Sequence, residues 1–172
     1  MSQQKGFKKH SNKRIQGRNR KIRGVNLAQL NVAKMIAPLE SPSMADFVAR
    51  LETVNARADS APGFIWRLRD EGAGATSIRI FADDLLLVNM SVWENPEVLN
   101  NFVYKQGDHS EALRKRREWF ESPTEAMVVC WMIDEGHHPS LEEARNKLTL
   151  LREIGSSKEA FSLKTASEFF RE

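Results

Sequence analysis

The chain has 172 residues, of which 41% are hydrophobic and 28% charged, and its formal net charge is +3. This length allows one good hydrophobic core and leaves little room for a second independent domain. No stretch approaches the roughly 18–20 consecutive apolar residues of a membrane span, and no secretory apolar segment follows the basic start, so we expect no membrane association and a cytoplasmic protein.

The positive charge is concentrated in residues 1–24, which contain nine Lys or Arg and no Asp or Glu. Subtracting these nine from the 26 basic residues of the chain leaves 17 basic against 23 acidic residues, so the rest of the chain is net acidic. Few apolar side chains accompany the basic ones, and residues 1–24 are therefore predicted to form a disordered tail. Such a tail could contact nucleic-acid phosphates weakly, serve in targeting, or be a linker without a function of its own.

The first half of the remaining chain is predicted to contain several strands and one helix. Short apolar runs, each flanked by Pro, Gly or Asp, predict strands over 25–32, 64–69, 76–81 and 85–93. Between the first two strands, apolar residues at helical spacing predict a helix over 44–58, which Ser43 and Asp46 would begin as a capping box. The run 85–93 is apolar on both faces, as is typical of a central strand that is covered on both sides.

The second half is predicted to alternate helices with one more strand. Asn95 and Pro96 are favourable at the start of a helix, which Gly107 interrupts and which is expected to resume over 110–121. A strand over 126–133 follows. Then comes a helix that Ser140 and Glu143 begin as a capping box and that Gly155 ends. Residues 164–172 form a C-terminal extension that the pattern does not place.

The order strand, helix, three strands, helix, strand, helix matches an α+β fold: a ferredoxin-like antiparallel sheet with helices on one face. Six short segments are more distinctive than the pattern alone. They are Leu27-Ala28-Gln29-Leu30-Asn31, Pro62-Gly63-Phe64-Ile65-Trp66-Arg67-Leu68, Ser91-Val92-Trp93-Glu94, Phe102-Val103-Tyr104, Arg116-Arg117-Glu118-Trp119-Phe120 and Gly136-His137. In these segments the chain resembles an uncharacterised family, catalogued as a domain of unknown function numbered 3291, of the dimeric α/β-barrel superfamily.

The resemblance implies a fold and an assembly and leaves the chemistry open. The superfamily includes small monooxygenases, haem-binding enzymes, muconolactone-type isomerases, stress proteins and ligand sensors. Residues 25–163 would form the dimeric α/β-barrel domain. Two copies would pair through the sheet face opposite the helices, where the apolar strand 85–93 would otherwise be exposed.

Polar residues on apolar strands mark a candidate pocket. Gln29 and Asn31 share one face of the first strand, and Asn89 and Ser91 share one face of the strand 85–93. Buried amides cost free energy unless they are hydrogen-bonded, so these side chains should meet a ligand, water, one another or an interface. The aromatic residues that would either line such a pocket or form plain core are Trp66, Trp93, Tyr104, Trp119 and Trp131.

Two residues are candidate bases. His109 is expected at a helix start, where the helix dipole would keep its imidazole neutral, and Glu94 follows the apolar strand. His137, in the loop before Ser140, is a candidate binding residue. Each also has a purely structural interpretation, as a surface histidine, a carboxylate that favours a helix dipole, or a loop cap.

Metal and thiol chemistry find little support in the sequence. It contains no HxH, HExxH or CxxC spacing, so no metal site is predicted. Cys130, the single cysteine, lies in an apolar run and is expected to be a small buried hydrophobe rather than a nucleophile.

These residues predict a protein that binds a small hydrophobic molecule in a mostly apolar pocket without a cofactor. It would be a monooxygenase or isomerase of a hydrophobic or aromatic metabolite, with His109 or Glu94 as base and with Asn31 and Asn89 as orienting donors. The alternative is a non-enzymatic dimeric module that senses a ligand or serves a structural role. A second alternative is a haem-binding enzyme of the same fold, with His109 as the axial ligand.

The tail gives a first testable prediction. If residues 1–24 contact nucleic acid through their nine positive charges, the full chain binds RNA or DNA at low salt, with an affinity that falls steeply as salt rises. A chain that starts at Gly24 then loses this binding. An electrophoretic mobility shift measured for both proteins over a salt series tests the prediction, and equally poor binding by both at low salt would refute it.

Overall fold

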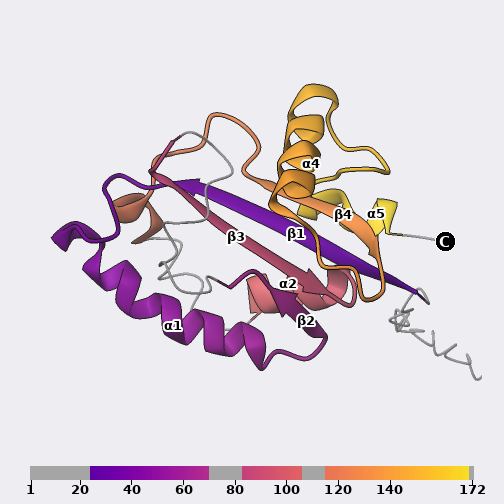
Figure 1. Cartoon of the computed structure of the whole chain (residues 1–172), viewed down its shortest axis with the longest axis horizontal. Helices are drawn as coiled ribbons and strands as arrows, with labels where there is room; N and C mark the ends of the chain where they lie inside the picture. Colours follow the sequence, from indigo (N-terminus) through magenta and orange to yellow (C-terminus); the bar gives the residue numbers. More distant parts are fainter. Residues whose placement is uncertain (1–23, 70–82, 106–114, 171–172) are drawn as a thin grey trace, which may run out of the picture.

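The computed structural model describes residues 24–69, 83–105 and 115–170 (Figure 1). The predicted strand 76–81, most of the predicted helix 110–121, His109 and the basic tail lie outside these residues. The sheet has four antiparallel strands in the order β2-β3-β1-β4. They are β1 (Val25–Lys34), β2 (Phe64–Arg67), β3 (Leu86–Trp93) and β4 (Val128–Asp134).

The helices are α1 (Ala45–Asp59), α2 (Pro96–Lys105), α4 (Leu141–Ile154) and the short α5 (Ala166–Phe169), with 3₁₀ turns η1 (Pro42–Met44) and η2 (Leu163–Thr165). Residues 115–119 are also helical. The predicted α+β class with an antiparallel sheet is confirmed. Within the described residues, no helix has both the length and the apolar character needed to cross a membrane.

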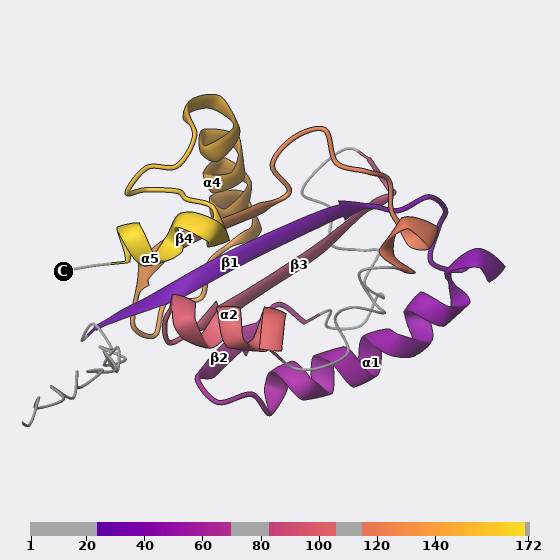
Figure 2. The ribbon, with the colours of Figure 1, turned by 180° about the vertical axis from the view of Figure 1, so that it is seen from behind.

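Alternation along the central strand β1 gives the sheet two different faces. We call the face that carries Leu27, Gln29 and Asn31 the α2 face, because Leu27 shares a core cluster there with Leu99 of α2. Figure 2 shows α2 in front of the strands on this side. We call the face that carries Ala28 and Leu30 the α4 face. Helix α4 packs there through an apolar stripe of Ala144, Leu148 and Leu151.

The position of α4 corrects the expectation that all helices lie on one face. Its apolar stripe matches the apolar α4 face, so it packs on the side that a partner sheet was expected to cover. Met90 and Val92 of β3 are already buried there within a single chain. The homodimer therefore stays a prediction, and these two side chains no longer argue for it.

The C-terminal residues pack on the α2 face. Phe161 pairs with Cys130 as an antiparallel bridge, with backbone N···O distances of 2.7 and 2.9 Å, beside β4. Ala166 and Phe170 are buried in the same cluster as Leu27. The C-terminal residues thus pack against the beginning of β1.

Helix α1 packs less tightly than α2 and α4. None of its residues is buried, and Val48 and Val54 are 42% and 49% exposed. At its start, Met44 and Phe47 join a small apolar cluster with Trp119. At its end, the Asp59 carboxylate accepts hydrogen bonds from the Arg67 guanidinium at 2.8 and 3.3 Å. Contacts hold the helix at both ends, and no residue in its middle is buried against the sheet.

The two predicted capping boxes differ in outcome. The backbone N–H of Glu143 donates to Ser140 Oγ at 3.1 Å, so the cap of α4 is confirmed. The cap at Ser43 is wrong, because Pro42 begins a 3₁₀ turn that already contains Ser43, and α1 begins without a side-chain cap. The predicted cap of α2 is confirmed, since Val98 N–H donates to Asn95 Oδ1 at 3.0 Å.

This difference gives a matched pair of variants. Ser140→Ala removes a cap bond and should lower the free energy of unfolding by about 1 kcal/mol. Ser43→Ala also replaces a serine that lies three positions before an acidic residue, but no cap hydrogen bond is lost. It should therefore lower the free energy of unfolding clearly less than Ser140→Ala does. Urea unfolding followed by circular dichroism measures both. Equal losses for the two variants would contradict the assignment of the caps.

Candidate functional site

A cavity of about 430 Å³ lies on the α2 face, between the sheet and the helices α1 and α2. We call it the sheet cavity. The sheet supplies a polar floor of Gln29, Asn31, Asn89 and Ser91. The walls are mostly apolar, and they are formed by Val54, Ala58, Phe64, Trp93, Leu99, Phe102, Val103, Tyr104, Val128 and Leu163, with Asn55, Arg67 and Arg116 among them.

A second cavity of about 270 Å³ adjoins the first under the start of α1. The two share Asn31, Val54, Asn89 and Arg116 as lining residues, so they are neighbouring compartments of one hollow. Trp119 lines the second compartment together with Phe47, Leu51 and Phe120. The exposed middle of α1 is consistent with this arrangement, because Val54 lines both compartments and is not buried among the described side chains.

Strand register brings the polar floor together. Gln29 lies opposite Ser91, and Asn31 lies opposite Asn89, in the β1–β3 ladder. Ser91 Oγ donates to Gln29 Oε1 at 3.0 Å and accepts from Trp93 Nε1 at 2.9 Å. This chain of hydrogen bonds fixes the Trp93 indole, which is 1% exposed, as a wall of the cavity.

The floor also holds hydrogen-bonding capacity that the described residues do not use. Asn31 Oδ1 is buried and accepts no hydrogen bond in the described part of the chain. A buried polar atom without a partner costs free energy, and such atoms are few in folded proteins. Asn31 is therefore the residue of the floor that most clearly calls for a bound molecule.

The structure places the predicted site residues in two groups. Gln29, Asn31, Asn89, Trp93 and Tyr104 line the sheet cavity, and Trp119 lines the adjoining compartment. Glu94 lines neither cavity, although it follows Trp93 directly. The proposed base His109 lies outside the described residues.

Trp66, Trp131 and His137 do not belong to this cavity. Trp131 is buried in the α4-face cluster, and Trp66 packs against the same cluster. Trp131 Nε1 and His137 Nε2 each lie 2.8 Å from a different carboxylate oxygen of Glu143. Burial is the largest single influence and would raise the pKa of Glu143, but these two hydrogen bonds, the charge of His137 and a backbone hydrogen bond at Ser140 together lower the pKa. His137 is thus a structural partner of α4.

A β-bulge explains the placement of Trp66. The register of β2 against β3 shifts between Phe64, which pairs with Trp93, and Trp66, which pairs with Val92. In a regular strand Trp66 would share the face of Phe64, because side chains two apart point the same way. The extra residue turns Trp66 to the α4 face, where it stacks on His138 with ring centroids 5.0 Å apart, and brings Arg67 to the cavity.

Sequence reasoning missed two cationic residues of the lining, Arg67 and Arg116. The alternating pattern of β2 hides Arg67, because the bulge reverses its face. Arg116 lies in a run of basic residues that reads as a solvated helix face. Both belong to segments that carry the family resemblance, and that was the only signal in the sequence that pointed to them.

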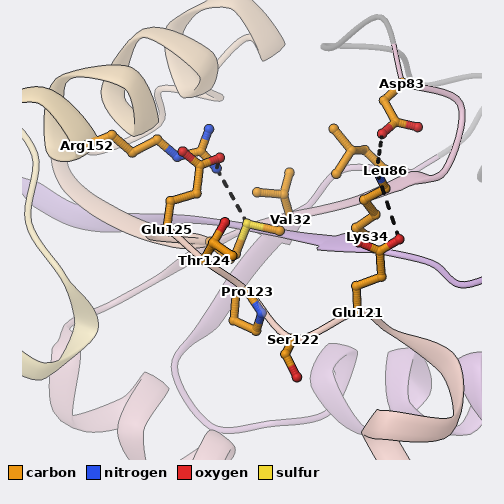
Figure 3. A pocket seen from close by; sticks show the side chains of 11 residues that line it. Val32, Lys34, Asp83, Leu86, Glu121, Ser122, Pro123, Thr124, Glu125 and Arg152 are labelled. Atoms are coloured by element: carbon orange, nitrogen blue, oxygen red, sulfur yellow. Dashed lines mark hydrogen bonds and ion pairs between the residues drawn. The ribbon is translucent and has the colours of Figure 1, made fainter.

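A third cavity, of about 290 Å³, lies near the end of β1 and is shown in Figure 3. Lys34 Nζ lies 3.2 Å from an Asp83 oxygen and 4.0 Å from a Glu121 oxygen, and Arg152 pairs with Glu125 at 3.0 Å. A hydrogen bond from the Leu85 backbone, followed by that of Lys34, holds the pKa of Asp83 below its usual value. Both cations lining this cavity are paired with carboxylates, so it is a weaker candidate than the sheet cavity.

Metal and thiol chemistry have no site among residues 24–69, 83–105 and 115–170. No group of three or more His, Cys, Asp or Glu side chains that could hold a metal lies together there. Burial raises the pKa of the Cys130 thiol to about 12, so the thiol is protonated at neutral pH.

Comparison with known proteins gives one strong match. A family model described as "Domain of unknown function (DUF3291)" matches residues 26–170. None of the curated protein sequences is significantly similar to the chain.

Similar solved structures include PA3566 from Pseudomonas aeruginosa, which is 12% identical with a TM-score of 0.41, over 66% of this chain and 96% of that one. NE2512, a protein of unknown function from Nitrosomonas europaea, is 10% identical with a TM-score of 0.40, over 67% and 94%. Neither likeness says what this chain binds.

The hydrogen-bond chain at the cavity floor can be tested by mutation. Ser91→Ala leaves the buried indole N–H of Trp93 without its acceptor, and should lower the free energy of unfolding by about 1–3 kcal/mol. Ser122→Ala, which removes an exposed loop hydroxyl, should change it by less than about 0.5 kcal/mol. Denaturant unfolding measures both. A Ser91→Ala variant as stable as the control would show that the hydroxyl does not hold Trp93.

Proposed function

The chain belongs to the family described as a domain of unknown function (DUF3291), and we propose that it is a small-molecule-binding protein whose site is the sheet cavity. The ligand is small and mostly apolar, with at least one group that hydrogen-bonds to the floor. The observation that carries the proposal is the patch of Gln29, Asn31, Asn89 and Ser91 on the floor of a cavity whose walls are mostly apolar. Apolar walls with a few placed polar groups are the usual composition of ligand sites.

The size and the walls of the cavity support this class of ligand. Its volume of about 430 Å³ falls within the roughly 300–1,000 Å³ typical of small-molecule sites. Phe64 and Phe102 both contact the Trp93 ring, with centroids 5.2 and 5.0 Å apart, and form a rigid aromatic wall. Such a wall favours an aromatic or aliphatic body in the ligand.

The floor would fix the orientation of the ligand. Asn31 Oδ1 accepts no hydrogen bond from the described residues, so a donor on the ligand would satisfy it. Gln29 is 9% exposed and its Oε1 is already engaged by Ser91, which leaves its amide N–H groups for an acceptor. The floor therefore offers both an acceptor and donors over a short distance along two strands.

A binding role has more support than a catalytic one. Cofactor-independent oxygenation or isomerisation needs a base beside the ligand, and the described residues that line the two compartments include no carboxylate and no imidazole. Within this proposal, catalysis would rest on His109, which lies outside the described residues. Ligand sensing by a non-enzymatic module needs no such group.

A haem site fits the described lining less well. Haem iron needs an axial His, Cys, Met or Tyr, and among the described lining residues Tyr104 alone is of these types, on the exposed end of α2. No step is therefore assigned to haem.

We include in the proposal that the protein acts as a cytoplasmic homodimer. The support is the superfamily resemblance, not the α4 face of β3, where Met90 and Val92 are buried within the chain itself. Light scattering tests the assembly, since a stable monomer at micromolar concentration would refute it.

Filling the cavity tests the proposed site. Val54→Trp places a large ring where Val54 borders both compartments, and should weaken binding of the neutral fluorescent probe N-phenyl-1-naphthylamine at least tenfold. Val48→Trp makes the same change on the same helix, at a similarly exposed residue that lines neither compartment. Probe titration with both variants, after circular dichroism has shown both folded, gives the comparison. Equal binding by the two variants, or no binding by the unmodified protein, would refute the site.

A further inference from the structure

Building on the proposed function, we infer that the ligand of the sheet cavity is an apolar monocarboxylate, and that Arg116 binds its carboxylate group. The inference rests on the charges of the cavity lining. The described lining of the two compartments includes the cations Arg67 and Arg116 and no Asp or Glu. A positive lining without a matching negative charge favours an anionic ligand.

Arg67 is already neutralised. Its Nε lies 2.8 Å and its guanidinium NH₂ group 3.3 Å from the two carboxylate oxygens of Asp59, in a two-pronged pair. The hydrogen bond from Arg67 is the largest influence that holds the pKa of Asp59 below its usual value, so Asp59 is ionised at neutral pH. Arg69, whose side chain is 64% exposed, also pairs with Asp59 at 3.2 Å. Arg67 therefore fastens β2 to the end of α1, and its two-pronged pair with Asp59 already occupies the hydrogen-bonding fork that a ligand carboxylate would need.

Arg116 is different. It is half-buried at the border that the two compartments share, and its guanidinium carbon lies 6.0 Å from the ring centroid of Phe120. Within the described residues, no carboxylate forms an ion pair with it. A half-buried guanidinium without an anion is costly, because it loses part of its hydration and gains no counter-charge in return.

The geometry of the guanidinium group indicates which anion fits. Its planar fork donates two parallel hydrogen bonds to a carboxylate, which is a stronger and more directional contact than a single bond. One arginine balances the single charge of a carboxylate. A phosphate monoester carries about −1.5 to −2 at neutral pH and would remain partly uncompensated in these apolar surroundings.

The rest of the lining accommodates the rest of such a molecule. From Arg116, the cavity continues over Asn31 and Asn89 to the aromatic wall around Trp93. An alkyl or aryl chain would lie against that wall while the carboxylate stays with Arg116. The floor amides would contact any polar substituent along the chain.

Competition with the fluorescent probe tests the inference. Decanoate and decanol have the same chain and differ in the head group, so each is titrated against N-phenyl-1-naphthylamine bound to the full-length protein at pH 7.5. We expect decanoate to displace the probe at least tenfold more effectively than decanol. Arg116→Gln should weaken decanoate at least tenfold and leave decanol unchanged, whereas Arg116→Lys should weaken decanoate less.

Arg117→Gln is the matched control, because it removes the same charge from an exposed neighbour. In this variant, decanoate and decanol should displace the probe as well as they do in the unmodified protein. If Arg117→Gln weakens decanoate as much as Arg116→Gln does, the effect is one of general electrostatics and the inference is overturned. The inference is also overturned if decanoate and decanol compete equally, or if neither displaces the probe. In both cases the cavity would still be a binding site. If the probe itself does not bind the unmodified protein, the proposed function fails as well.

Discussion

The rest of the structure depends on side-chain alternation along β1. This strand pairs with β3 on one side and β4 on the other, so each of its side chains is committed to one of two covered faces. Ala28, Leu30 and Val32 point into a dry core that α4 closes. Gln29 and Asn31 point the other way, into the sheet cavity. A slip of one residue would exchange the two sets and bury the amides under α4, so the dry core fixes the register that the polar floor needs.

The cavity exists because α1 does not complete the core. A helix of 15 residues normally buries an apolar stripe, yet none of the residues of α1 is buried. It is held instead by the small cluster at Met44 and by the ion pair of Asp59 with Arg67. Residues from the middle of α1 instead line the sheet cavity and its adjoining compartment. Forgoing this burial costs stability, which is the usual relation between a preformed site and the fold that carries it.

Much of the fold could be predicted from local pattern. Short apolar runs flanked by Pro, Gly or Asp identified the described strands, and the alternation of side chains along a strand correctly placed Gln29 and Asn31 on one face and Asn89 and Ser91 on one face. That these two pairs lie opposite each other depends on strand register, which local patterns do not encode. Ser43 and Ser140 both follow a proline, so the local pattern does not separate them: Ser140 caps α4, whereas Pro42 begins a 3₁₀ turn that contains Ser43.

The sequence does not indicate on which face of the sheet Trp66 and Trp131 lie. One extra residue in β2 sends Trp66 to the α4 face and Arg67 to the cavity, and no composition signal marks the bulge. Trp131 looks equivalent to Trp93 in the sequence, but the register of β4 puts it against Glu143. Arg116 was hidden for another reason, since its neighbours are also basic and only tertiary packing singles it out.

The four tryptophans allow a direct test of the central claim that ligand binds on the α2 face. Trp93 and Trp119 line the two compartments, while Trp66 and Trp131 lie on the α4 face. Each indole N–H gives one signal in a ¹H–¹⁵N spectrum, and single Trp→Phe variants assign them. Titration with N-phenyl-1-naphthylamine should shift the Trp93 and Trp119 signals and leave those of Trp66 and Trp131 in place. Shifts confined to Trp66 and Trp131 would place the binding site on the other side of the sheet and contradict the account.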